Sequence, residues 1–156
     1  MGKRLHLFLF ILILFFSSVS HGQNCFGYQK LHCFPPESKF TYTYNDASVG
    51  FLFSSGEQRD VPFSFYNGKD YRITLCADSV FQDVIRFTIL SDDGKTLYSN
   101  ESHQYSLNAE FSSNKTQDVF LRIEAPEASK GLSDTVSYKG CIGILIEDMN
   151  SIKTGF

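Results

Sequence analysis

The sequence contains no tryptophan, no cluster of basic residues and none of the motifs HExxH, CxxC or GxSxG. Without those motifs the common zinc, redox and serine-nucleophile sites are not indicated. Without a basic cluster, neither nucleic acid nor an anionic membrane surface is a favoured partner. Beyond residue 22 only His32 and His103 remain as histidines, neither at a metal-ligand spacing, and we expect both in solvated loops. We therefore predict a protein that is not an enzyme and holds no cofactor.

The first 22 residues have the features of a secretory signal peptide. Two basic residues precede an almost wholly apolar run over residues 5–16, and small residues follow. We expect cleavage after Gly22, with cleavage after Ser20 as the alternative. The apolar run of about 12 residues is shorter than the ~20 that a membrane-spanning helix needs. We predict no membrane span after cleavage, and a protein that is secreted, periplasmic or held at the cell surface.

The chain beyond the signal peptide is acidic and contains four cysteines. It loses two of the 14 basic residues and keeps all 17 acidic ones, so its formal net charge is −5. In an oxidising compartment four cysteines most often form two disulfides, with three possible pairings. We hypothesise that Cys25 bonds to Cys33 and Cys76 to Cys141. The second bond would close a long loop, worth about 4 kcal/mol on the chain-entropy model.

Alternation of apolar and polar residues dominates the rest of the chain, most clearly between residues 70 and 90. A period of two is typical of strands with one buried face. Asn67-Gly68 predicts a hairpin, and the Asp-Asp-Gly-Lys turn at 92–95 predicts another. Pro62 confines its strand to an edge, a bulge or a first ladder position. We predict strands within residues 40–44, 48–54, 61–66, 71–75, 85–90, 96–98, 104–111, 119–125 and 141–146.

Eight or nine short strands with frequent turns indicate an all-β fold, an antiparallel β-sandwich or a barrel. The strand at 141–146 is apolar on both faces and is predicted to be central in its sheet. No stretch of ten residues beyond the signal peptide has a helical apolar stripe. We predict a disulfide-closed N-terminal flap over residues 23–38, a sandwich domain over 39–148 and a tail over 149–156.

Two groups of side chains are candidate ligand sites. Aspartates in adjacent loops can bind calcium, although aspartate also populates turns for local backbone hydrogen bonding, which is the favoured interpretation. Exposed tyrosines can form a carbohydrate platform, although alternation places several of them in the core with only the hydroxyl reaching water. The calcium candidates are Asp78, Asp83, Asp92 and Asp93, and the platform candidates are Tyr42, Tyr44, Tyr66, Tyr98 and Tyr105.

Two N-glycosylation sequons are present, Asn100-Glu101-Ser102 and Asn114-Lys115-Thr116. Both fall in predicted loops, as glycosylation requires. Their use depends on whether the host modifies exported proteins.

The phrases "DYRITLCAD", "VIRFTILSDDGKTLYSN", "VFLRIEAP" and "GCIGILIED" carry a resemblance to a known family. Together they resemble the β-sandwich of bacterial pre-peptidase C-terminal domains, over roughly residues 40–148, and small secreted bacterial proteins of that style. The resemblance implies a jelly-roll-like accessory or adhesion module with no catalytic residues to transfer.

From these observations we hypothesise an exported, non-enzymatic module that binds at its surface or assists an extracellular complex. Its partner would be a protein or a glycan at the cell surface. A carbohydrate-binding module and a small hydrolase with an unrecognised site are the two alternatives.

Overall fold

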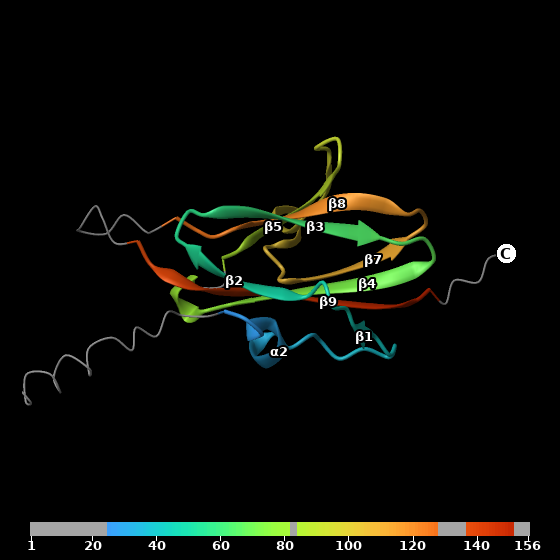
Figure 1. Ribbon diagram of the computed structural model, residues 1–156, viewed down its shortest axis with the longest axis horizontal. Coiled ribbons are helices and arrows are strands. Elements are labelled where there is room, and N and C mark those ends of the chain that lie inside the picture. The colour runs from blue at the N-terminus through green and yellow to red at the C-terminus, as the bar shows by residue number, and fades with distance from the viewer. Residues whose placement is uncertain (1–24, 82–83, 128–136, 152–156) are drawn as a thin grey trace, which may run out of the picture.

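The computed structural model describes residues 25–81, 84–127 and 137–151, so the predicted signal peptide lies outside the described residues. Nine strands form two antiparallel sheets that face each other, which confirms the predicted all-β sandwich (Figure 1). In the described part of the chain no helix is long and apolar enough to cross a membrane. The elements are α2 (Tyr28–His32), β1 (Thr43–Tyr44), β2 (Val49–Ser54), β3 (Gln58–Phe65), β4 (Lys69–Ala77), η1 (Ser79–Phe81), β5 (Arg86–Ser91), β6 (Thr96–Ser99), η2 (Asn100–His103), β7 (Asn108–Ser113), β8 (Gln117–Glu124) and β9 (Lys139–Asn150).

The strand order is that of a jelly roll. Sheet A has the order β2-β9-β4-β7, with the two-residue β1 also pairing with β9, and sheet B has the order β3-β8-β5-β6. The chain passes repeatedly from one sheet to the other, so strands that are neighbours in a sheet are mostly distant in sequence. Without the two-residue β1, the eight strands β2–β9 have the arrangement of a double-sheet jelly roll.

The core lies between the sheets and is built from the inward-facing residue of each alternating pair. The strand β9, which lies between β2 and β4 as predicted for 141–146, is buried on both faces. Its outward-facing Cys141 and Leu145 are buried as well, at 7% exposure each. They are covered by the N-terminal segment, residues 25–45, which lies on the outer face of sheet A. Side chains with at most 1% exposure fill the core: Phe53, Tyr71, Ile73, Phe81, Ile85, Phe87, Ile89, Val119, Leu121, Ile123, Ile142, Ile144 and Ile146.

Of the two predicted hairpins, one is confirmed and the other is wrong. The turn at 92–95 joins β5 to β6, which pair with each other in sheet B. The Asn67-Gly68 turn joins β3 to β4, but β3 pairs with β8 and β4 pairs with β7 and β9. Gly68 has the positive φ of 77° that such a turn needs. The same local geometry thus serves a connection between the two sheets, because turn residues specify a bend and not the partner strand.

Several element boundaries differ from the prediction. The strand predicted at 40–44 is reduced to Thr43–Tyr44, and the strand β9 runs to Asn150, past the predicted domain end at 148. The flap contains the short helix α2, which is too short for a periodic signal. The strand β3 is an edge strand of sheet B, as Pro62 predicted.

Acid should destabilise the fold through Asp148 at the end of sheet A. Its carboxylate accepts hydrogen bonds from Lys69 Nζ at 2.5 Å and from Asn45 Nδ2 at 2.7 Å. Burial raises the pKa of Asp148, but these two hydrogen bonds outweigh burial and hold the pKa below its ordinary value of 3.8. Because the folded pKa is lower than the unfolded one, this stabilisation is complete above about pH 4 and is lost as pH falls through the folded pKa.

We therefore expect that lowering the pH from about 6 to about 3 destabilises Asp148→Asn less than it destabilises the wild type. The urea midpoint of each protein, measured at each pH, gives the comparison. Asp46→Asn, at an exposed position, is the control and should keep the wild-type pH dependence. Equal acid sensitivity of wild type and Asp148→Asn would contradict the assignment.

Candidate functional site

Two disulfides attach the N-terminal segment, residues 25–45, to the outer face of sheet A. Cys25 bonds to Cys141 on β9, and Cys33 bonds to Cys76 on β4. All four cysteines are therefore in disulfides, as predicted, but the hypothesised pairing is wrong. Cys76 and Cys141 both project from the outer face of sheet A, and the two cysteines that flank α2 lie directly over them. The flap is thus not closed on itself, because its two cysteines are bonded to the neighbouring strands β9 and β4. The helix α2 lies against sheet A (Figure 1).

Two glycines make room for α2 on this face. Gly50 on β2 and Gly143 on β9 are cross-strand partners. A Cβ on Gly50 would lie 2.3 Å from the carbonyl oxygen of Cys25, and a Cβ on Gly143 would lie 3.0 Å from the Cα of Gln29. Since real Cβ atoms do not approach other atoms that closely, the backbone of the segment can sit on the sheet only because these side chains are absent.

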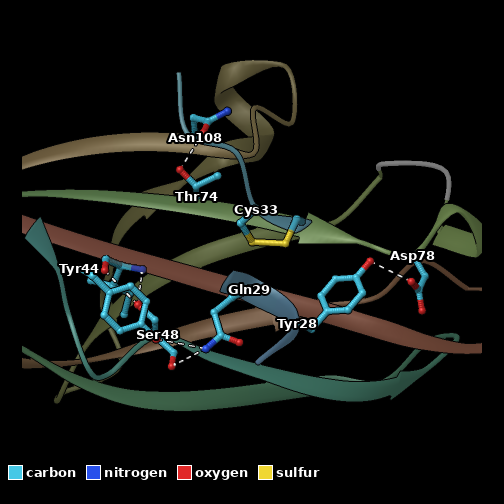
Figure 2. The surroundings of a disulfide bond; sticks show 10 residues. Tyr28, Gln29, Cys33, Tyr44, Ser48, Thr74, Asp78 and Asn108 are labelled. Atoms are coloured by element: carbon cyan, nitrogen blue, oxygen red, sulfur yellow. Dashed lines mark hydrogen bonds between the residues drawn. A yellow bond between two sulfur atoms is a disulfide. The ribbon is translucent and has the colours of Figure 1, made fainter. Parts of the chain in front are cut away.

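Buried polar contacts fix the segment further. Gln29, with 4% exposure, donates from Nε2 to the Ser48 carbonyl at 3.1 Å and to the Tyr44 hydroxyl at 3.3 Å (Figure 2). On the other side of the helix the Tyr28 hydroxyl donates to Asp78 Oδ1 at 2.8 Å. Burial, and after it the hydrogen bond to Asp78, raises the pKa of Tyr28 well above its ordinary range. The segment is therefore a fixed part of the surface of the sandwich.

Three of the side chains that point away from the sheet are apolar and strongly exposed, and the exposed Lys30 and His32 lie among them. Phe26 is 91% exposed, Leu31 69% and Phe34 80%. They lie within residues 26–34, and the cysteines next to the two phenylalanines, Cys25 and Cys33, are bonded to neighbouring strands, so the three side chains occupy one small region. We call these three residues the apolar ridge. The alternation rule could not find it, because the ridge lies on a helical turn and its flanks and not on a strand.

The second half of the segment is held by Arg72 of β4. This arginine is 6% exposed and donates from Nε to Glu147 at 2.8 Å and from Nη1 to the carbonyl oxygen of Pro36 at 2.9 Å. Its guanidinium also lies 4.5 Å from the centroid of the Tyr42 ring, a cation–π distance. Arg72 thus ties two points of the segment to sheet A.

Beside Tyr42 the surface has a hollow of about 360 Å³, which we call the acidic hollow. Its walls come from the N-terminal segment, from the edge strand β7 of sheet A and its neighbour β4, and from the end of β9. Burial first, and then the charges of Glu110 and Asp70, raise the pKa of Tyr42, and both carboxylates line the same hollow as its ring. The lining includes Phe40, Tyr42, Asp70, Glu110, Phe111 and Met149.

The calcium candidates serve local structure where they are described. Asp78 accepts hydrogen bonds from the Tyr28 hydroxyl and, at 2.6 Å, from the backbone N–H of Cys141. Asp93 accepts from Ser91 and from the backbone N–H of Lys95 within the β5–β6 turn, and Asp92 accepts from the N–H of Asp93. Asp83 lies outside the described residues. Across residues 25–81, 84–127 and 137–151, no three metal-ligating side chains come together.

The candidate tyrosines do not form one platform. Tyr44 is in β1 of sheet A and Tyr42 directly precedes that strand, whereas Tyr98 is on β6 of sheet B, packed against Phe87 and Phe111. Of the five, only Tyr98 packs against the core, so the expectation that several are core residues is wrong. The other two are Tyr66, 56% exposed in the β3–β4 connection, and Tyr105, which follows η2.

The two histidines are exposed, as predicted, but each stacks on a tyrosine. The ring of His32 lies 4.3 Å from that of Tyr28, and the ring of His103 lies 5.0 Å from that of Tyr98. They sit on the short helices α2 and η2 and not in irregular loops.

No family model matches the chain, and no curated protein matches it. The resemblance to pre-peptidase C-terminal domains therefore stays a prediction. One solved structure that is similar is that of PliG from Aeromonas hydrophila, a periplasmic inhibitor of g-type lysozyme. The identity is 6%, the TM-score is 0.49, and the match covers 74% of this chain and 94% of that one. At this identity and TM-score the similarity supports no conclusion about this chain.

Proposed function

We propose that this protein is an exported, non-enzymatic module that binds a partner protein through the apolar ridge. The observation that carries the proposal is the exposure of Phe26, Leu31 and Phe34 on a segment that two disulfides hold in place. Exposed apolar clusters on soluble proteins mark interaction sites. A fixed segment loses little conformational entropy on binding, which favours affinity.

Export fits the two disulfides, which persist in oxidising compartments. A protein partner fits the ridge better than a membrane, because the chain is acidic and anionic lipid surfaces attract basic segments. Aromatic side chains are also enriched where protein interfaces are buried. The expected partner surface is therefore an apolar pocket that takes up Phe34 or Phe26.

A triple variant of the ridge, Phe26→Ser with Leu31→Ser and Phe34→Ser, tests the proposal. Wild-type protein, cross-linked in the exported fraction of its host, should capture a partner that the ridge variant does not. The purified partner should bind the variant at least about 30-fold more weakly, since a buried anchor residue contributes about 2 kcal/mol or more.

The matched control replaces three exposed apolar residues outside the N-terminal segment, Tyr66, Leu97 and Phe120, by serine. It replaces exposed apolar side chains on other parts of the surface and should bind like the wild type. Equal capture by all three proteins would contradict the role of the ridge. A wild-type dimer that the ridge variant converts to a monomer in sedimentation would identify a second copy of this chain as the partner.

A further inference from the structure

The acidic hollow is separate from the apolar ridge, and its walls combine aromatic rings with carboxylates. Phe40 is 51% exposed at its rim, and Tyr42 and Phe111 supply further rings. Its volume of about 360 Å³ falls within the ~300–1,000 Å³ of small-molecule sites. The hollow is therefore large enough to receive a ligand group.

The charge of the hollow is negative and unbalanced. Glu110 lies opposite Arg72 in the β4–β7 register, and Asp70 lies two residues earlier on β4 with its side chain on the same face. Arg72 is already engaged by Glu147 at 2.7 Å and by the segment above it. Among the residues that the structure describes, neither Asp70 nor Glu110 has an ion-pair partner, and Asp70 Oδ1 is a buried oxygen without a hydrogen-bond donor. The hollow therefore carries two carboxylates that no cation among the described residues pairs with.

The lining selects an organic cation over a metal ion. Calcium takes six to eight oxygen ligands, whereas this hollow offers two carboxylates among aromatic rings and Met149. Rings and carboxylates together stabilise a guanidinium or an ammonium group, the rings through cation–π attraction and the carboxylates through charge-assisted hydrogen bonds. The stem of a basic side chain would pack against Met149 and Phe40.

We propose that the acidic hollow binds the guanidinium or ammonium end of an organic cation, with Asp70 and Glu110 accepting its hydrogen bonds and Tyr42 providing a ring face. The cation can be a lysine or arginine side chain of a protein or a free polyamine, which present the same chemistry. The inference does not depend on the ridge, so it stands whether or not the ridge binds a partner.

Nuclear magnetic resonance titration of the full exported chain tests this site. The probes are N-acetyl-arginine amide, its neutral counterpart N-acetyl-citrulline amide, and spermidine. The arginine amide should shift the backbone amide signals of Asp70, Phe111 and Met149 in a saturable way, and the citrulline amide should not. Tighter binding of spermidine than of the arginine amide assigns the site to free polyamines, and the reverse order assigns it to protein side chains.

Two variants separate a specific site from general charge attraction. Asp70→Asn with Glu110→Gln should weaken arginine-amide binding at least about tenfold, through two lost charge-assisted hydrogen bonds. Glu37→Gln with Asp46→Asn removes the same charge from two exposed positions outside the hollow and should change affinity less than about twofold.

Tyr42→Leu leaves the net charge unchanged and should weaken binding about threefold or more through loss of the ring face. The dispersion of the amide spectrum shows whether each variant remains folded. Equal shifts with the citrulline amide, equal weakening by the two charge variants, or saturable shifts of the same signals by calcium would each overturn the proposal.

Discussion

Replacing Cys25 and Cys141 together by serine is expected to lower the free energy of unfolding by about 5 kcal/mol. The two cysteines are 116 residues apart, and in the chain-entropy model the stabilisation grows with the logarithm of that loop. Single domains are stable by only ~5–15 kcal/mol, so this loss is a large fraction of the total. Equilibrium denaturation in urea measures this loss of free energy. A variant that is already unfolded at room temperature without urea would also agree with the prediction.

The matched comparison is the double serine variant of Cys33 and Cys76, which are 43 residues apart. The shorter loop predicts a smaller loss, about 4 kcal/mol. Peptide mapping without reduction should recover one peptide that joins Cys25 to Cys141 and one that joins Cys33 to Cys76. A peptide joining Cys25 to Cys33 would show that the segment is not attached to the sheet, and the basis of the apolar ridge would be lost.

Asn100→Ala is expected to lower the free energy of unfolding by about 3 kcal/mol, the upper range for leaving buried polar groups unpaired. Asn100 is fully buried. Its side chain accepts from the backbone N–H of Phe87 at 2.8 Å and donates to the carbonyl oxygens of Ile85 at 2.9 Å and Ser106 at 3.2 Å. The side chain thus replaces missing backbone partners where β5 begins, and alanine would leave these groups without partners. Chemical denaturation of the variant measures the loss.

The other sequon provides the control. Asn114 is exposed in the connection between β7 and β8, so Asn114→Ala should change stability by less than about 0.5 kcal/mol. Asn100 is buried and begins η2, so the prediction that both sequons fall in loops is wrong for this one. Expressed in a secretory host that glycosylates proteins, the folded chain should carry a glycan at Asn114 and none at Asn100. Full occupancy of Asn100 would contradict its burial.

The strands were predictable because each depends on nearby residues. Alternation located β4, β5 and β8, and the Asp-Asp-Gly-Lys turn correctly paired β5 with β6. Pro62 correctly placed β3 at an edge, since proline cannot donate to a second neighbour. The apolar character of both faces of residues 141–146 correctly indicated a central strand.

The candidate sites were less predictable, because their residues are brought together from distant parts of the chain. The sequence makes Asp78 a calcium candidate, whereas in the structure its carboxylate accepts a hydrogen bond from the Tyr28 hydroxyl, 50 residues away in the chain. Asp70 and Glu110 were not singled out, and they meet only because β4 and β7 pair in sheet A. Gly50 and Gly143 carry a signal in retrospect, since glycine inside a strand suggests a close backbone approach.

The amino-acid sequence by itself determined that this protein is an all-β sandwich with strands at these positions, because backbone alternation and turn chemistry act over a few residues. Only the tertiary structure decided which sheet each strand joins, which cysteines meet and which side of sheet A the N-terminal segment covers. Those outcomes depend on contacts between residues tens of positions apart. Local patterns do not specify such contacts, because the same turn or the same cysteine is compatible with several partners until the two sheets pack.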